Sequence, residues 1–305
     1  MVFNAKDFFT DFGIEYLETG HKHCRYGWIQ TKCPFCTGNP GYHLGYNLTH
    51  GFFTCWRCGY HPVVRVVHIF TAFGWEKSKE LVAEYSDGFC PPPTLPLKDK
   101  NNPIHLKLPR FTRVLKEPHK EYLQKRGFIP EVLQEKWRIK GTGPIGVFKH
   151  RIIAPIYFNG ALVSYQGRDY TDKSNLRYRA CDRRSEIIHH KDILYGIDLA
   201  KGSSCILVEG ITDAWRLGPG AVATFGIKYT ESQFALLWER FDKVFIMFDD
   251  DKEAVKRAKK LGAELSTVFN IKAEICLIKG DPGSLPQKKA DRYKRQLLGK
   301  DAGLN

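Results

Sequence analysis

The sequence has no hydrophobic run long enough to cross a membrane. Its longest apolar stretches fall well short of the roughly 18 residues that a spanning helix requires. The first ten residues carry acidic and aromatic side chains and contain no apolar core of a secretory signal. We therefore expect no membrane partner, a cytoplasmic location and a reducing environment.

Two further features are missing. No G-x-x-x-x-G-K-[ST] phosphate-binding loop occurs, which excludes ATP hydrolysis by that route. No internal repeat is present, which argues against a repeat architecture. Any helicase that works with this protein is therefore expected on a separate chain.

The composition is that of a soluble globular protein with an excess of positive charge. The 305 residues suit two or three domains, and 43% are hydrophobic. Lys and Arg number 47 against 33 acidic residues, a formal net charge of +14. A polyanion is the expected partner, and nucleic acid is the first candidate. A generally basic soluble protein is the alternative.

Four of the nine cysteines form two C-x-x-C pairs, separated by 18 residues. This spacing is typical of one tetrahedral Cys₄ zinc site whose role is structural. The predicted ligands are Cys33, Cys36, Cys55 and Cys58. The other five are expected to be ordinary thiols, namely Cys24, Cys90, Cys181, Cys205 and Cys276.

Aromatic and basic residues surround the predicted zinc site. Aromatic rings can stack on unpaired bases while basic groups follow the backbone of a single strand. The candidates for DNA recognition are His43, Tyr46, Trp56 and Arg57. The alternative is that the aromatic residues pack a small core.

The last hundred residues alternate short apolar runs with helical patterns. The predicted strands are 204–209, 221–225, 243–248 and 273–278, and the clearest helix covers 252–268. Buried strands separated by helices imply a parallel sheet covered on both faces. Ligands bind such sheets at the carboxyl ends of the strands.

Carboxylates follow three of these predicted strands. Glu209 ends the first, Asp249–Asp251 end the third, and Asp281 comes just after the fourth. Grouped carboxylates repel one another unless a cation lies among them, and oxygen ligands suit Mg²⁺ or Mn²⁺. The alternative for each single residue is a turn or a helix cap.

These residues carry a family resemblance. The segments ILVEGITDAWRLGPGAVATFGIKYTESQFALL and VFIMFDDDKEA resemble the Toprim fold of DnaG-type bacterial and phage primases. The resemblance implies that Glu209, Asp249, Asp251 and Asp281 hold one to three Mg²⁺ or Mn²⁺ ions, and that Asp213 is also catalytic. Asp250 and Gly283 depart from the family pattern, which leaves the number of ions open.

The segment 151–195 resembles the basic half of the polymerase domain in the same family. The shared pattern is an R-x-x-x-P-I strand, a G-R strand end, an R-Y pair and a Lys before L-Y-G. The resemblance implies nucleotide and template binding by Arg151, Arg168, Arg177, Tyr178 and Lys191. Arg offers bidentate contacts to phosphate and Lys a point charge.

The order CPFC…FFTCWRCG, followed by VVRVVHIF, resembles the zinc-binding domain of those primases, which selects the start site on the template. The whole resemblance implies a DNA primase that makes short RNA primers from ribonucleoside triphosphates on single-stranded DNA. It also implies the cytoplasm of a bacterium, or of the host if a phage encodes the chain. Two other proteins with this fold compete, a non-enzymatic recombination mediator and a nuclease.

The expected fold is a small β-rich zinc ribbon followed by an α/β catalytic domain with a Toprim parallel sheet. A Pro- and Asn-rich stretch is expected to be the linker between them. The predicted boundaries are 1–85 for the zinc domain, 86–110 for the linker and 111–305 for the polymerase domain. Within the latter, 111–201 is the basic part, 202–285 is Toprim and 286–305 is a C-terminal segment.

Overall fold

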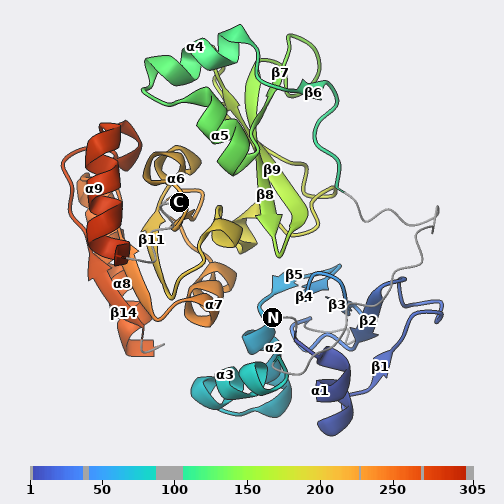
Figure 1. Cartoon of the computed structure of the whole chain (residues 1–305). Coiled ribbons are helices and arrows are strands. Elements are labelled where there is room, and N and C mark those ends of the chain that lie inside the picture. The colour runs from blue at the N-terminus through green and yellow to red at the C-terminus, as the bar shows by residue number, and fades with distance from the viewer. Residues whose placement is uncertain (1–2, 37–40, 87–105, 227, 269–270, 300–305) are drawn as a thin grey trace. The chain divides into compact units, whose positions relative to one another are not determined.

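The computed structural model describes residues 3–36, 41–86, 106–226, 228–268 and 271–299. The chain divides into two compact units, Met1–Ile104 and His105–Asn305 (Figure 1). Within the described ranges no helix combines the length and the apolar character that crossing a bilayer requires. Most of the predicted linker lies outside the described residues, and the predicted domain boundaries stay predictions.

The first unit is built on an antiparallel sheet with the strand order β1-β2-β3-β4-β5. The strands are β1 Tyr16–Leu17, β2 Trp28–Thr31, β3 Leu44–Asn47, β4 Phe52–Cys55 and β5 Gly59–His61. Three helices accompany the sheet, α1 Ala5–Asp11, α2 Val63–Thr71 and α3 Trp75–Glu84. The side chain of Asn4 caps α1 by accepting a hydrogen bond from the Asp7 amide.

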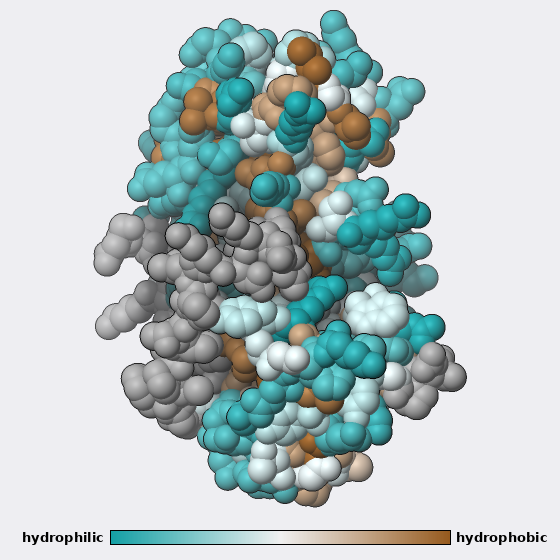
Figure 2. Space-filling model, turned by 90° about the vertical axis from the view of Figure 1, so that its right-hand side faces the viewer, coloured by the Kyte–Doolittle hydropathy of each residue, from teal (hydrophilic) through white to brown (hydrophobic). Residues whose placement is uncertain are grey.

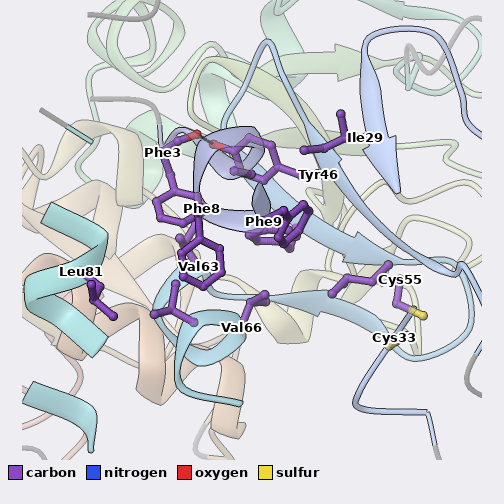
Figure 3. Close-up of a cluster of buried hydrophobic side chains, with 14 residues drawn as sticks. Phe3, Phe8, Phe9, Ile29, Cys33, Tyr46, Cys55, Val63, Val66 and Leu81 are labelled. Atoms are coloured by element: carbon purple, nitrogen blue, oxygen red, sulfur yellow. Dashed lines mark hydrogen bonds between the residues drawn. The ribbon is translucent and has the colours of Figure 1, made fainter. Parts of the chain in front are cut away.

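The core of this unit is rich in aromatic side chains. Phe3, Phe8 and Phe9 from the N-terminal segment meet Tyr46 and Phe53 from the central strands. Figure 3 shows Phe3, Phe8, Phe9 and Tyr46 in this cluster together with Val63 and Val66 of α2. Burying one such ring contributes about 2–3 kcal/mol to the stability of the fold. Cys33 and Cys55 belong to the same buried cluster, so the packing of this core also positions two of the four clustered cysteines.

The second unit contains two sheets. The first is antiparallel, with the order β10-β9-β8-β7-β6, and the long hairpin of β8 and β9 forms its centre. Its strands are β6 Thr112–Arg113, β7 Lys140–Thr142, β8 Arg151–Phe158, β9 Ala161–Asp169 and β10 Tyr178–Ala180. Helices α4 Glu117–Lys125 and α5 Pro130–Trp137 lie beside it (Figure 1).

The second sheet of this unit is parallel, with the order β12-β11-β13-β14. Its strands are β11 Ser204–Val208, β12 Ala221–Ala223, β13 Lys243–Ile246 and β14 Lys272–Ile275. Its helices are α6 Ile211–Leu217, α7 Glu231–Arg240, α8 Lys252–Val268 and α9 Gln287–Leu298, and η3 Pro282–Ser284 is a short 3₁₀ turn. Helix α9 packs on α6 and β11, and α8 packs on β14.

The strand order contains a reversal. From β11 the chain moves to β12 on one side and then returns past β11 to β13 on the other. Right-handed crossovers therefore place α6 on one face and α7 with α8 on the opposite face. The loops after β11 and β13 diverge at this switch point, which is where open parallel sheets bind ligands.

The predicted fold class is confirmed, since a β-rich unit with four clustered cysteines precedes an α/β unit with a parallel sheet. The helix predicted over 252–268 matches α8. Strand β14 differs from its prediction because it lies earlier, over Lys272–Ile275, and its side chains are largely exposed. It forms one edge of the sheet, where burial is incomplete.

Candidate functional site

The four predicted zinc ligands converge at one point of the first unit. The Sγ atoms of Cys33 and Cys58 lie 3.6 Å apart, those of Cys36 and Cys55 also 3.6 Å, and those of Cys36 and Cys58 3.5 Å. Sulfur atoms around a tetrahedral zinc with bonds of about 2.3 Å are about 3.8 Å apart. The cluster therefore fits a structural zinc ion.

The surroundings of the cysteines also suit a metal. The Arg57 amide donates to Sγ of Cys55 at 3.4 Å, and Nε2 of His61 lies 3.1 Å from Sγ of Cys58. Burial, and then the neighbouring Cys55, raise the pKa of Cys58 to about 12, so a cation is needed to hold all four as thiolates. His61 was not predicted, although it follows the second C-x-x-C pair closely.

The four predicted recognition residues separate into two groups. Trp56 is 66% exposed, Arg57 is also exposed, and the guanidinium of Arg57 lies 5.8 Å from the Trp56 ring centre. His43 is buried beneath Trp56, with ring centres 4.7 Å apart. Tyr46 lies in the core, where its hydroxyl donates to the carbonyl of Phe3, so its ring is not exposed for stacking on a base in this conformation.

The parallel sheet gathers carboxylates at its switch point. Oxygen atoms of Asp213, Asp249 and Asp281 all lie within 4.8 Å of one another. They come from α6, from the end of β13 and from the turn before η3. Glu209, directly after β11, accepts a hydrogen bond from the Asp249 amide at 3.3 Å. Gly283 is required beside this group, since a Cβ there would lie 2.6 Å from Oδ1 of Asp213.

Burial and the neighbouring carboxylates both raise the pKa values of this group, and burial is the larger cause. Burial, and then Asp249, raise the pKa of Glu209 to about 7. Burial, and then Asp281, raise the pKa of Asp249 to about 6. Burial and Asp281 also raise the pKa of Asp213 well above its usual range. A bound divalent cation would relieve the repulsion among these carboxylates, and the oxygen-only donor set suits Mg²⁺ or Mn²⁺.

The remaining acids of this region have local partners. Oδ1 of Asp251 accepts from the amides of Glu253 and Ala254, both at 2.9 Å, and so caps α8. Asp250 is exposed and accepts from the Gly280 amide. The structure thus places Asp251 outside the close trio and gives it a capping role, while Asp213 joins the trio although it was not predicted as a metal ligand.

A basic cavity of about 390 Å³ lies in the same unit. Arg168 and Arg177, both predicted, line it together with Lys125 and Arg126, which were not predicted. The guanidinium of Arg168 stacks over the ring of Tyr178 at 4.9 Å and donates to the hydroxyl of Tyr122. Four cationic side chains beside two acidic ones, Asp169 and Asp172, make this cavity suitable for phosphate groups.

Arg151 does not take part in the cavity. It is buried, and its guanidinium donates to the carbonyls of Gly167, Leu176 and Arg177. In this conformation its donors hold the loop before β10, and its predicted role in nucleotide or template binding stays a prediction.

Lys191, which was also predicted to bind nucleotide or template, contacts the parallel sheet and does not line the basic cavity. Its ammonium donates to the carbonyl of Phe225, whose φ of 61° is unusual for a residue other than glycine. The next residue, Gly226, has a φ of 114° and donates its amide to the carbonyl of Glu209. The strained turn after β12 thus brings Lys191 to the strand end that carries Glu209.

Arg216 of α6 joins the basic cavity to the acidic trio. Its guanidinium donates to the carbonyls of Arg126 and Gly127 on one side and to the carbonyl of Gly283 on the other. Arg126 lines the cavity, and Gly283 abuts Asp213. Arg216 was not predicted, because nothing local in the sequence shows that every residue of its helix is buried.

The geometry can be compared with solved structures. The DnaG primase catalytic domain bound to single-stranded DNA is similar with a TM-score of 0.51 and 20% identity, covering 59% of this chain and 70% of that one. The DnaG catalytic core gives 0.51 and 20%, covering 59% and 72%. Over this part, the chain shares the fold of DnaG primase catalytic cores.

A third structure, the Aquifex aeolicus primase with its zinc-binding and RNA polymerase domains, has a TM-score of 0.49 and 19% identity, covering 96% of this chain and 82% of that one. No protein-family model matches the sequence, and no curated protein matches it.

Proposed function

We propose that this chain is a DNA primase that condenses ribonucleotides into short RNA primers on a single-stranded DNA template. One observation carries the proposal. Asp213, Asp249 and Asp281 converge at the switch point of a parallel sheet, in the unit that also holds the basic cavity. The fold shared with DnaG catalytic cores supports this reading.

The acidic trio and Glu209 would hold one to three Mg²⁺ or Mn²⁺ ions, with Asp251 as a further ligand. When bound, such ions lower the pKa of an attacking hydroxyl and neutralise charge on a triphosphate. Arg168 and Arg177 would bind phosphates of the incoming nucleotide or the template. Arg216 would hold their cavity at a fixed position relative to the acidic trio. Lys191 would add positive charge at the Glu209 strand end.

The first unit would bind the template. Trp56 offers an exposed ring for stacking on a base, and Arg57 beside it offers a cation for the backbone. We assign start-site selection to this unit, with zinc holding its fold and taking no part in the chemistry.

The product of one reaction separates this proposal from its competitors. The purified chain is incubated with single-stranded DNA, labelled ribonucleoside triphosphates and Mg²⁺. We expect short labelled RNA from the parent and from Asp250→Asn, and less than 1% of it from Asp249→Asn, which removes a carboxylate of the trio. Asp250→Asn is the matched control because it changes the adjacent, exposed carboxylate.

Other products would support other functions. Cleaved DNA without RNA would indicate a Toprim nuclease, and DNA binding with neither product would indicate a recombination mediator. Equal RNA synthesis by Asp249→Asn and the parent would overturn the placement of the site. The expectation of a helicase on a separate chain rests on the sequence alone and stays a prediction.

A further inference from the structure

A second group of potential metal ligands lies apart from the cysteines and the acidic trio. Glu186, His189 and His190 each have one donor atom within 4.8 Å of the other two. Nδ1 of His189 lies 2.5 Å from Oε2 of Glu186, and Nδ1 of His190 lies 2.8 Å from Oε1. Both imidazoles therefore face the same carboxylate.

The three donors lie at hydrogen-bonding distances, somewhat closer than in a coordination sphere. Nitrogen and oxygen ligands at about 2.0–2.2 Å from one tetrahedral ion are separated by about 3.3–3.6 Å, so the side chains must move apart by about 0.5–1 Å to admit the ion. The two imidazoles already aim their Nδ1 atoms at the carboxylate. Besides this movement, binding requires that each ring carry its proton on Nε2 instead.

The Glu186 carboxylate accepts a further hydrogen bond from a buried side chain, as metal-ligating carboxylates commonly do. Ser164 of β9, which is buried, donates its hydroxyl to Oε1 of Glu186 at 2.6 Å. The Glu186 side chain is 1% exposed, whereas His189 is 26% exposed. The base of the cluster is thus fixed by a second layer of contacts, and its outer edge is open to an ion from solvent.

The cluster is joined directly to the catalytic region. His190 begins the 3₁₀ turn η1 His190–Asp192, and the next residue is Lys191. The Lys191 carbonyl accepts from the hydroxyl of Thr230, which caps α7, and its ammonium reaches Phe225. An ion held by His189 and His190 would therefore restrain the backbone that carries Lys191.

We propose that Glu186, His189 and His190 form a second transition-metal site, of the Zn²⁺ class, which holds Lys191 in place beside the parallel sheet. Two imidazoles and one carboxylate suit Zn²⁺ and leave a fourth position for water, whereas Mg²⁺ prefers oxygen ligands alone. The occupancy of the site does not depend on the proposed primase function, so the two can fail separately.

The test counts metal ions in the full chain. The protein is equilibrated with Zn²⁺ in the presence of excess Mg²⁺, unbound metal is removed, and zinc is measured by mass spectrometry. We expect two zinc ions per chain in the parent and one in His189→Gln. This variant is chosen because His189 is the most exposed ligand and its loss should leave the fold intact, which circular dichroism checks.

Two controls assign each ion. Cys58→Ser should also bind one zinc ion, because it disrupts the cysteine site and leaves the cluster intact. His23→Gln removes an exposed histidine elsewhere and should retain two. Zn²⁺ should slow hydrogen exchange at His190–Asp192 at least tenfold in the parent and not in His189→Gln.

Some results would overturn the proposal. One zinc ion per chain in the parent means that the cluster is only a hydrogen-bonded network. Two zinc ions in a folded His189→Gln chain, or one in His23→Gln, places the second ion elsewhere. Unchanged hydrogen exchange on addition of Zn²⁺ contradicts the link to Lys191.

Discussion

Without a bound metal ion, ionisation of the carboxylates at the switch point lowers the stability of the native state. Glu209 and Asp249 have pKa values of about 7 and 6, against about 4.3 and 3.9 in an unfolded chain. Between these limits the native state binds more protons than the unfolded state. The free energy of unfolding therefore falls as pH rises from about 4 to about 7, and levels off above that range.

This sign gives a prediction for Asp249→Asn. Without divalent cations at pH 7.5, the variant should be as stable as the parent or more stable by up to about 1 kcal/mol, a value discounted because the carboxylates are partly exposed. With Mg²⁺, only the parent should gain stability, and less so at pH 5.5, where protons compete with the metal. Urea unfolding at both pH values measures this, and a clear loss of stability without metal would contradict a metal-binding role.

At the scale of residues, the sequence predicted which residues gather at a site better than it predicted their burial and hydrogen-bond partners. The two C-x-x-C pairs and the acids after predicted strands could be recognised, because residues that are close in sequence or at one edge of a sheet must lie close together. Burial was not visible. Arg151 and Tyr46 were predicted to bind ligands, yet their polar groups are used inside the fold. The capping role of Asp251 depends on where α8 begins, which the sequence alone locates poorly.

At the scale of elements, α6 connects the segment between α4 and α5 to the turn η3 beside the acidic trio. Its Arg216 donates to carbonyls on both sides, and its guanidinium lies 4.1 Å from the ring centre of Phe128. The alternation of strands and helices predicted the parallel sheet, because after their first residues, Ser204 and Lys243, strands β11 and β13 contain only buried apolar residues. Contacts between distant segments, such as this one, leave no local periodicity to detect.

Replacing Arg216 should therefore damage both stability and synthesis. We expect Arg216→Lys to lose about 2–4 kcal/mol, because one ammonium cannot satisfy carbonyls on opposite sides and leaves buried acceptors unpaired. Arg240→Lys is the control, since Arg240 is exposed and should change stability by less than about 0.5 kcal/mol. Thermal unfolding measures both, and equal effects would show that Arg216 is not the connection described.

At the scale of the whole molecule, the excess of positive charge favours contact with a polyanion. The face shown in Figure 2 is mostly hydrophilic, with hydrophobic residues in scattered patches. The formal charge of +14 coexists with a compact acidic group at one sheet edge. In the proposed function, basic groups would hold nucleic acid through its phosphates, and the acidic trio would hold metal ions.

The central claim is that the second unit forms the phosphodiester bond at the acidic trio, while the first unit selects where synthesis begins. The most direct measurement compares two gels, one of de novo synthesis and one of extension from a short RNA annealed to the template. Cys58→Ser removes a zinc ligand and should unfold the first unit, since metal binding supplies most of its folding free energy.

We predict that Cys58→Ser loses de novo synthesis and keeps a weakened extension, because the basic contacts of the first unit are lost as well. Asp249→Asn and Asp251→Asn should lose both reactions, and Asp250→Asn should keep both. Extension by Asp249→Asn at the rate of the parent would contradict the account, because the bond would then be formed without the acidic trio.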